Sequence, residues 1–209
     1  MRLGFFGGTF NPVHYGHLRA AEEAGTALEL DTVLFLPSGN PPLKNDDLAD
    51  VHDRVALTRL AIAGNPRFSL SEVELRTGRK SFTVDTARAL AAQYPFDDRV
   101  FIIGADAFLD LPNWHRPEEL TTLIDLAVVT RPGVAPELVR QSPFLDARLA
   151  SDPETWRLRG GRTAVFLETT PLAISSTQIR RLVREGRSIR YLVPEPVASY
   201  IENKQLYRS

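Results

Sequence analysis

The sequence contains no cysteine, and this absence excludes disulfide bonds, thiolate zinc sites and cysteine nucleophiles. Long apolar runs are missing as well. No stretch approaches the roughly 20 apolar residues that span a bilayer, and the apolar run at the N-terminus is too short for a signal peptide. We therefore expect a cytoplasmic protein without a membrane partner.

An excess of either charge is also lacking. The chain has 25 basic and 26 acidic residues, and its pI is near 6.4. Such a balance provides no overall field that would attract a nucleic-acid backbone, so a polymeric nucleic-acid partner is not expected. Only three of the basic residues are lysines, which we attribute to compositional bias. Nothing in the composition indicates an oligomeric state.

The apolar pattern alternates between short strand-like runs and longer helical ones over the whole chain. Strands or extended segments are expected at 2–8, 32–42, 67–75, 99–108, 125–133 and 163–170, and helices at 15–30, 53–65, 83–94, 176–186 and 194–207. This alternation predicts an α/β fold with a doubly wound, mostly parallel sheet of about five strands before residue 134. We expect one domain over residues 1–209, with a helical C-terminal part from about residue 171. Residues 134–162 show no clear pattern.

The segment "GGTFNPVHYGHL" (7–18) directly follows the first predicted strand. Ligands of doubly wound sheets bind outside the C-terminal ends of the strands. Gly7 and Gly8 would let a ligand approach the main chain closely, and the helix that follows offers unpaired N–H groups to an anion. The segment therefore predicts a phosphate-binding site, although neither G-x-G-x-x-G nor G-x-x-x-x-G-K-[ST] occurs in the chain.

Two histidines, His14 and His17, stand three residues apart where that helix begins. A structural hydrogen-bonding role is one reading of each ring, and contact with bound phosphates is the other. A protein-built metal site would need further ligands, and neither His52, His115 nor a local carboxylate has the spacing to supply them. The pair beside a glycine turn therefore favours phosphate binding over metal binding.

A second polar cluster lies near the C-terminus in "PLAISSTQIRRLVREG" (171–186). It places Ser175, Ser176 and Thr177 at the start of an amphipathic helix, where hydroxyls and free N–H groups gather. Arg180 is expected in the first turn, from which its planar guanidinium could reach an anion at that helix end. The alternative is an ordinary N-cap followed by a solvated arginine.

Together the two segments resemble the two signature motifs of the HxGH-type nucleotidyltransferase superfamily. More closely, the chain is similar to the bacterial nicotinate mononucleotide adenylyltransferases over nearly its whole length. The likeness continues, in order, through "LPSGNPPLK", "SFTVDT", "FIIGADAFLDLPNW", "VVTRPG" and "PEPVASYIENKQLY". Residues 134–162 match nothing, and Asn11 stands where aspartate is commoner in the family.

The resemblance implies transfer of AMP from ATP to the 5′-phosphate of nicotinate mononucleotide, in the biosynthesis of NAD. The products would be nicotinate adenine dinucleotide and pyrophosphate. No covalent intermediate is expected, and Mg²⁺ would be carried by ATP rather than by a metal site of the protein. ATP and nicotinate mononucleotide are thus the expected small-molecule partners.

The resemblance also implies roles for particular residues. His14, His17 and Arg180 would be catalytic and would contact the phosphates of ATP. The remaining ATP-binding residues would be Gly8, Thr9, Phe10, Gly104, Asp106, Ser175, Ser176 and Thr177. Lys44, Thr83 and Trp114 would bind the pyridine mononucleotide. Asp106 could instead be a helix N-cap, and Trp114 could be part of the core.

Two other functions are compatible with the motifs. Phosphopantetheine adenylyltransferases share both motifs, but they are typically shorter and lack segments like 81–86 and 101–114. A nucleotide sensor could keep the fold without turnover. The presence of both histidines and of Arg180 argues against such a loss of chemistry.

Overall fold

The computed structural model describes residues 1–41, 47–75, 82–130, 136–149 and 152–208. Within these residues the strands form one sheet of eight, in the order β3-β2-β1-β4-β5-β8-β7-β6. The strands are β1 (Arg2–Gly8), β2 (Thr32–Pro37), β3 (Phe68–Leu70), β4 (Asp98–Gly104), β5 (Asp125–Val129), β6 (Leu145–Leu149), β7 (Asp152–Leu158) and β8 (Thr163–Leu167). All pairs from β3 to β8 are parallel, and β7 is antiparallel to both of its neighbours. The predicted α/β fold with a mostly parallel sheet is confirmed.

Helices connect the strands and continue to the C-terminus. They are α1 (Tyr15–Ala27), α2 (Val51–Ile62), α3 (Thr83–Gln93), α4 (Ala105–Leu109), the 3₁₀ helix η2 (Leu111–Asn113), α5 (Pro117–Leu123), α6 (Pro136–Val139), α7 (Ser176–Arg184) and α8 (Glu195–Asn203). The short helix α4 replaces the strand end and loop that the sequence predicted for residues 105–108. The reason is local, because the strand ends at Gly104 and this residue becomes the N-cap of α4.

The segment without a clear sequence pattern contains α6 and the hairpin of β6 and β7. In β6 the three central residues, Asp146 to Arg148, are all exposed. The pairing of β6 with β7 also shifts register at two places. A half-buried strand is recognised by alternating apolar and polar residues. Because this edge strand buries so little, the alternation is missing and the strand could not be predicted.

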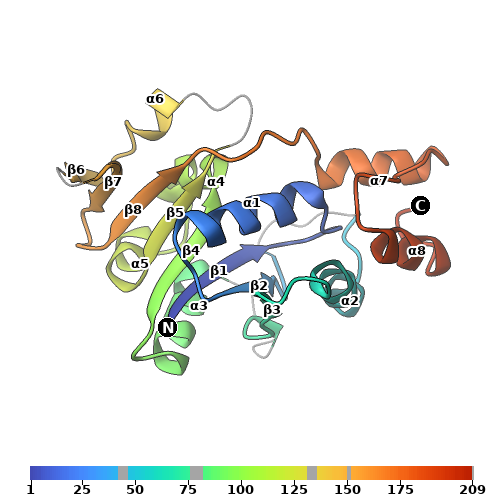
Figure 1. The fold of residues 1–209 in the computed structure, drawn as a ribbon, viewed down its shortest axis with the longest axis horizontal. Coiled ribbons are helices and arrows are strands. Elements are labelled where there is room, and N and C mark those ends of the chain that lie inside the picture. The colour runs from blue at the N-terminus through green and yellow to red at the C-terminus, as the bar shows by residue number, and fades with distance from the viewer. Residues whose placement is uncertain (42–46, 76–81, 131–135, 150–151, 209) are drawn as a thin grey trace.

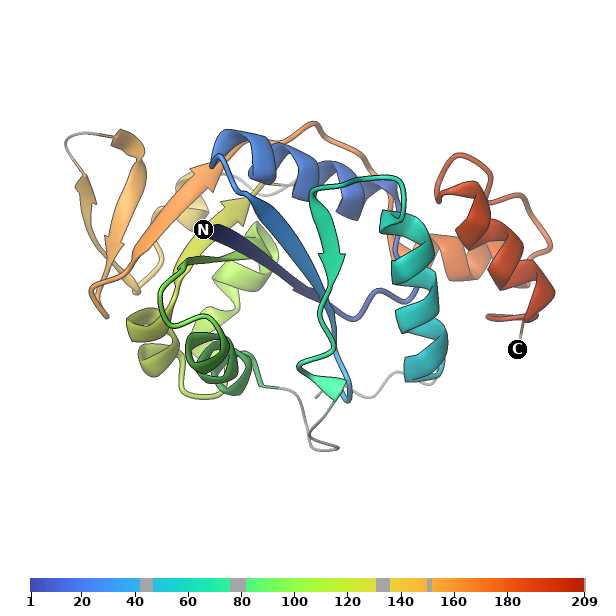
Figure 2. The same ribbon diagram turned by 60° about the horizontal axis from the view of Figure 1, so that its bottom comes forward.

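The sheet is covered on both faces, because its central strands bury consecutive residues on opposite sides. Phe5 belongs to one hydrophobic cluster, with residues of α3, α4 and α5, whereas Phe6 belongs to the other, with residues of α1, α2, α7 and α8. Figures 1 and 2 show α1 on one side of the sheet and α3 and α5 on the other. Helices α7 and α8 lie at the end of the molecule opposite the β6–β7 hairpin.

The order of the strands creates a binding crevice at one position. From β1 the chain continues to β2 and β3 on one side, and then crosses to β4 and β5 on the other. The connections at the C-terminal ends of β1 and β4 therefore diverge, and doubly wound sheets bind their ligands at such a switch point. The turn after β1, residues 9–14, lies there; we call it the glycine turn because it directly follows Gly7 and Gly8, the last residues of β1.

Candidate active site

The turn between β1 and α1 has an unusual backbone at Phe10. This residue has a φ of 48°, in the left-handed region that a residue with a side chain rarely adopts. Such a conformation costs on the order of 1–3 kcal/mol and persists only where the surroundings enforce it. The Phe10 ring is 2% exposed and packs against Phe6, Phe35 and the edge of His17. Burial of this ring offsets the backbone cost and holds the turn beside the histidines.

Three main-chain carbonyls of this turn accept hydrogen bonds from side chains of other elements. Arg54 Nη1 on α2 donates to the Thr9 oxygen at 2.8 Å. From α7, Arg180 Nη1 donates to the Asn11 oxygen at 2.9 Å and Ser176 Oγ donates to the Pro12 oxygen at 2.9 Å. The last two bonds join residues 169 and 164 positions apart. They bring the two polar clusters found in the sequence into one site.

His14 and His17 form a stacked pair at the start of α1. His14 is the N-cap and is 2% exposed, and the two ring centroids are 3.7 Å apart with the planes inclined by 28°. The main-chain N–H of His14 donates to Nδ1 of His17 at 3.2 Å. Because Nδ1 accepts, a neutral His17 carries its proton on Nε2. Nε2 is then the nitrogen with which His17 would donate to a phosphate.

Gly16, between the two histidines, is required by the stacked arrangement. A Cβ atom at this position would lie 3.0 Å from both Cε1 and Nδ1 of the His14 ring. A larger residue would press on that ring, which would have to shift by a few tenths of an ångström. The spacing of histidine, glycine and histidine is therefore explained by packing as well as by chemistry.

The three hydroxyls at the start of α7 have different surroundings. Ser175 is the N-cap, and its hydroxyl oxygen caps the helix by accepting from the Gln178 N–H at 3.1 Å. Ser176 binds the turn, as described above. Thr177 is exposed, and its hydroxyl forms no hydrogen bond within the described part of the chain. Of the three, Thr177 is the hydroxyl that a ligand could engage without displacing another contact.

Arg180 is buried rather than solvated, with 5% of its surface exposed. It is the fifth residue of α7 and so lies one residue beyond the first turn, where the sequence had placed it. Its Nε is 3.8 Å from the Asp47 carboxylate, while Arg184 Nη1 binds the same carboxylate at 2.8 Å. The hydrogen bond from Arg184 holds the pKa of Asp47 below its ordinary value. No hydrogen bond from Arg180 Nη2 to another described residue is found.

The residues expected at the pyridine ring come from two neighbouring segments. Thr83 is the first residue of α3, and Trp114 follows η2. The rings of Phe82 and His115, which adjoin them in the sequence, are 4.4 Å apart. The structure thus brings Thr83 and Trp114 into the same region. Lys44 lies outside the described residues.

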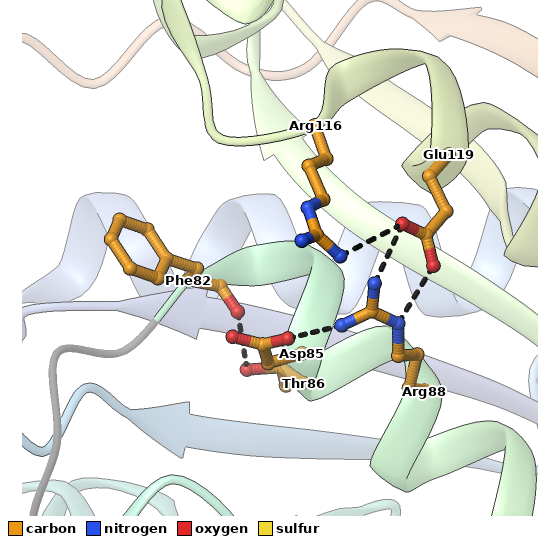
Figure 3. A network of polar contacts seen from close by, with 6 residues as sticks. All are labelled: Phe82, Asp85, Thr86, Arg88, Arg116 and Glu119. Atoms are coloured by element: carbon orange, nitrogen blue, oxygen red, sulfur yellow. Dashed lines mark hydrogen bonds and ion pairs between the residues drawn. The ribbon is translucent and has the colours of Figure 1, made fainter.

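Ion pairs fix the start of α3 against α5. Arg88 donates to Asp85 at 2.5 Å and to the two carboxylate oxygens of Glu119 at 2.7 and 2.6 Å, as Figure 3 shows. Arg116 approaches Glu119 at 3.8 Å. These contacts link the first turn of α3 to the segment that follows Trp114.

Gly104 and Asp106 lie at the C-terminal end of β4, on the other side of the switch point from β2. Gly104 is the N-cap of α4, and Asp106 is the second residue of that helix. Asp106 is therefore not an N-cap, and its side chain is exposed. Its carboxylate is therefore accessible enough to accept hydrogen bonds from the hydroxyls of a ribose.

Sequence reasoning missed two residues that shape the turn. The first is Arg54, which is completely buried beneath it. The second is the side chain of Asn11, whose Nδ2 donates to the main-chain oxygen of Asp47 at 2.9 Å and whose Oδ1 accepts from the Ala49 N–H at 3.1 Å. The sequence shows Arg54 only as an arginine within the apolar pattern of a helix. That pattern does not distinguish a buried arginine from a solvated one.

The two bonds of Asn11 predict the effect of replacing it with aspartate, the commoner residue in the family. Asn11→Asp would place a buried carboxylate oxygen against the Asp47 carbonyl and would lose the donated hydrogen bond. We expect a loss of about 1–3 kcal/mol in the free energy of unfolding, measured with urea. Asn203→Asp, at an exposed position of α8, is the control. Equal stability of Asn11→Asp and the wild type would contradict the assigned hydrogen bonds.

The comparison with protein families agrees with this geometry. Residues 5–182 match the cytidylyltransferase-like family, so the chain belongs to that family and its fold is that of a nucleotidyltransferase. Probable nicotinate-nucleotide adenylyltransferases of Geobacter metallireducens and Pseudomonas aeruginosa are 44% and 41% identical to it over 212 residues. These alignments cover 99% and 100% of this chain and 98% of each relative. Within the family the chain is a member of the nicotinate-nucleotide adenylyltransferases, a group of enzymes.

Solved structures show the same fold. The nicotinic acid mononucleotide adenylyltransferase of Plasmodium falciparum in complex with NaAD has a TM-score of 0.76 at 16% identity, covering 99% of this chain and 97% of that one. A putative nicotinate-nucleotide adenylyltransferase from Vibrio parahaemolyticus has a TM-score of 0.68 at 21% identity, covering 100% and 97%. Among the described helices, none combines the length and apolar character needed to cross a membrane.

Proposed function

We propose that the protein transfers AMP from ATP to the 5′-phosphate of nicotinate mononucleotide, a step in NAD biosynthesis. The observation that carries this proposal is the bonding of α7 to the glycine turn through Ser176 and Arg180. It gathers a bare main chain, two imidazoles and a guanidinium at one switch point, as a triphosphate would require. The names of the bacterial relatives support the choice of substrate.

In the proposed reaction an oxygen of the mononucleotide phosphate attacks the α-phosphorus of ATP. The bond from that phosphorus to the bridging oxygen breaks, and pyrophosphate leaves with the electron pair. No protein side chain forms a covalent bond. The protein contributes positioning and stabilisation of the charge that develops on the phosphates.

We assign each phosphate of ATP to hydrogen-bond donors of the site. His17 Nε2 would donate to the α-phosphate, with His14 beside it, and the main chain of Gly8, Thr9 and Phe10 would line the approach. Thr177 and Arg180 Nη2 would hold the β- and γ-phosphates, supported by the free N–H groups at the start of α7. Ser175 and Ser176 would shape this helix start.

The remaining assignments concern ribose and the acceptor. Asp106, with Gly104, would bind ribose hydroxyls, and Trp114 would stack on the pyridine ring. Thr83, at the start of α3, would face the carboxylate of that ring, and Lys44 would bind the mononucleotide phosphate. We further propose that residues 1–209 act as a single domain in the cytoplasm.

Mg²⁺ is proposed to arrive bound to ATP. Among the residues that the structure describes, no three or more histidine, aspartate or glutamate side chains gather as a metal site would need. The acidic side chain nearest to the α7 arginines, Asp47, is already paired with Arg184. Phosphate oxygens would therefore supply most of the ligands, and the ion would neutralise phosphate charge.

The test is incubation of the pure protein with ATP and Mg²⁺ together with one acceptor at a time. The acceptors are nicotinate mononucleotide, nicotinamide mononucleotide and phosphopantetheine, and products are separated by chromatography. We expect nicotinate adenine dinucleotide and pyrophosphate, and no product when EDTA removes the metal. A product formed only with phosphopantetheine would identify the protein as a phosphopantetheine adenylyltransferase. ATP binding without any product would identify a sensor.

A further inference from the structure

Arg54 is the largest of the side chains that the structure buries completely, with 1% of its surface exposed. It forms no ion pair with a described carboxylate. Instead its three nitrogens donate to three main-chain carbonyls, those of Thr9 at 2.8 Å, Gly39 at 3.1 Å and Ala49 at 3.2 Å. Burial lowers the pKa of this guanidinium, while the charges of Asp50 and Glu74 oppose the shift, and the side chain stays protonated at neutral pH. A helix on the surface does not need a buried arginine with three carbonyl partners for its own stability.

The three carbonyls belong to different segments that meet at the C-terminal ends of β1 and β2. Thr9 lies in the glycine turn, Gly39 follows β2, and Ala49 precedes α2. The side chain of Asn11 also reaches the last of these segments, through the Ala49 N–H. The guanidinium of Arg54 is therefore the common point at which these three segments are joined.

The bond to Thr9 also orients the peptide group that follows it. In a trans peptide the carbonyl and the next N–H point in opposite directions. Because the Thr9 oxygen points toward Arg54, the N–H of Phe10 points away from it. No acceptor for this N–H occurs among the described residues. A charged donor on the carbonyl also polarises the peptide group and strengthens its N–H as a donor.

We propose that Arg54 is a positioning residue for adenylyl transfer, which turns the Thr9–Phe10 peptide so that its N–H faces the phosphates of ATP. This inference rests on the function proposed above. Arg54 itself does not touch the substrate. It acts through the turn, from the side opposite the ligand. Its other two hydrogen bonds hold the segments at Gly39 and Ala49 beside the turn.

The test compares Arg54→Met and Arg54→Lys with a matched control, Arg59→Met. Arg59 lies on the same helix but is exposed, and its only ion pair with a described residue is to Glu72 at 2.9 Å. The lysine variant keeps the charge but loses the planar group that serves three acceptors. Circular dichroism first establishes a low temperature at which each variant is folded. Binding of ATP and of adenosine is then measured by calorimetry, and kcat and KM are measured for the transfer reaction.

For Arg54→Met we expect ATP to bind about tenfold more weakly and kcat/KM for ATP to fall about 10²-fold, because misplaced phosphate contacts have effects of this size. Arg54→Lys should fall between Arg54→Met and the wild type. Adenosine binding should be unchanged in both variants, since adenosine has no phosphate. Arg59→Met should match the wild type in every measurement.

Three results would overturn the proposal. One is wild-type ATP binding and turnover in folded Arg54→Met, and another is an equal loss for ATP and adenosine. The third is the absence of folded protein for both Arg54 variants, which would assign the residue to the fold as a whole. A wild-type protein that binds ATP but forms no dinucleotide would refute the proposed function, while the ATP and adenosine measurements would still test Arg54.

Discussion

His17→Ala is expected to lower kcat by about 10² to 10³ and to leave the affinity for ATP nearly unchanged. The Nδ1 atom of His17 accepts the His14 N–H, so Nε2 carries the proton that can be donated to the α-phosphate. Negative charge builds on this group in the transition state, and the hydrogen bond becomes stronger there than in the ground state. An interaction of this kind contributes to kcat rather than to substrate binding.

Steady-state kinetics and calorimetry with ATP would measure the two effects separately. The control is His52→Ala, since His52 is exposed on α2 and its imidazole forms no hydrogen bond with another described residue. We expect this control to behave as the wild type. A wild-type kcat in His17→Ala would refute the role of His17 at the phosphate, and a parallel loss in both variants would indicate a general effect of losing a histidine.

The second large effect is a preference of roughly 10² or more for nicotinate over nicotinamide mononucleotide. The acid carries a carboxylate, whereas the amide presents an NH₂ group that is itself a donor. The main-chain N–H groups at the start of α3 would bind the carboxylate and would face the amide as unpaired donors. An unpaired buried donor costs roughly 1–3 kcal/mol, and about 1.4 kcal/mol corresponds to a factor of ten. Two such contacts suffice for the expected preference.

The measurement is kcat/KM for each mononucleotide at saturating ATP. Thr83→Val tests the main-chain origin of the preference, because it removes the hydroxyl and keeps the N–H. We expect the selectivity to survive this change. Comparable kcat/KM for the two substrates in the wild type would place the enzyme in a dual-specificity class. Loss of selectivity in Thr83→Val would transfer the recognition to the side chain.

Much of the fold could be predicted from local patterns. The strands β1, β4 and β5 are buried on both faces and therefore read as continuous apolar runs. Helix α7 was evident from its amphipathic spacing, and its N-cap from Ser175. The β6–β7 hairpin escaped because a strand exposed at its centre has no apolar pattern. Helix α4 escaped because five residues are little more than one helical turn and cannot show a repeating apolar pattern.

The amino-acid sequence by itself determined the class of fold, the glycine turn and the pair of histidines. These features depend on residues only a few positions apart, whose geometry is set by backbone conformation and helical spacing. Even the need for Gly16 is local, since it follows from the neighbouring ring of His14. The family resemblance rests on the same short segments.

Only the tertiary structure decided how the turn is held. Arg54 meets the Thr9 carbonyl across 45 residues, and Arg180 meets the Asn11 carbonyl across 169. Which carbonyl a guanidinium reaches depends on how α2 and α7 pack against the sheet, and main-chain carbonyls are the same at every position of a sequence. The physical reason is therefore that these partners carry no side-chain identity, so no pattern of residues could have named them.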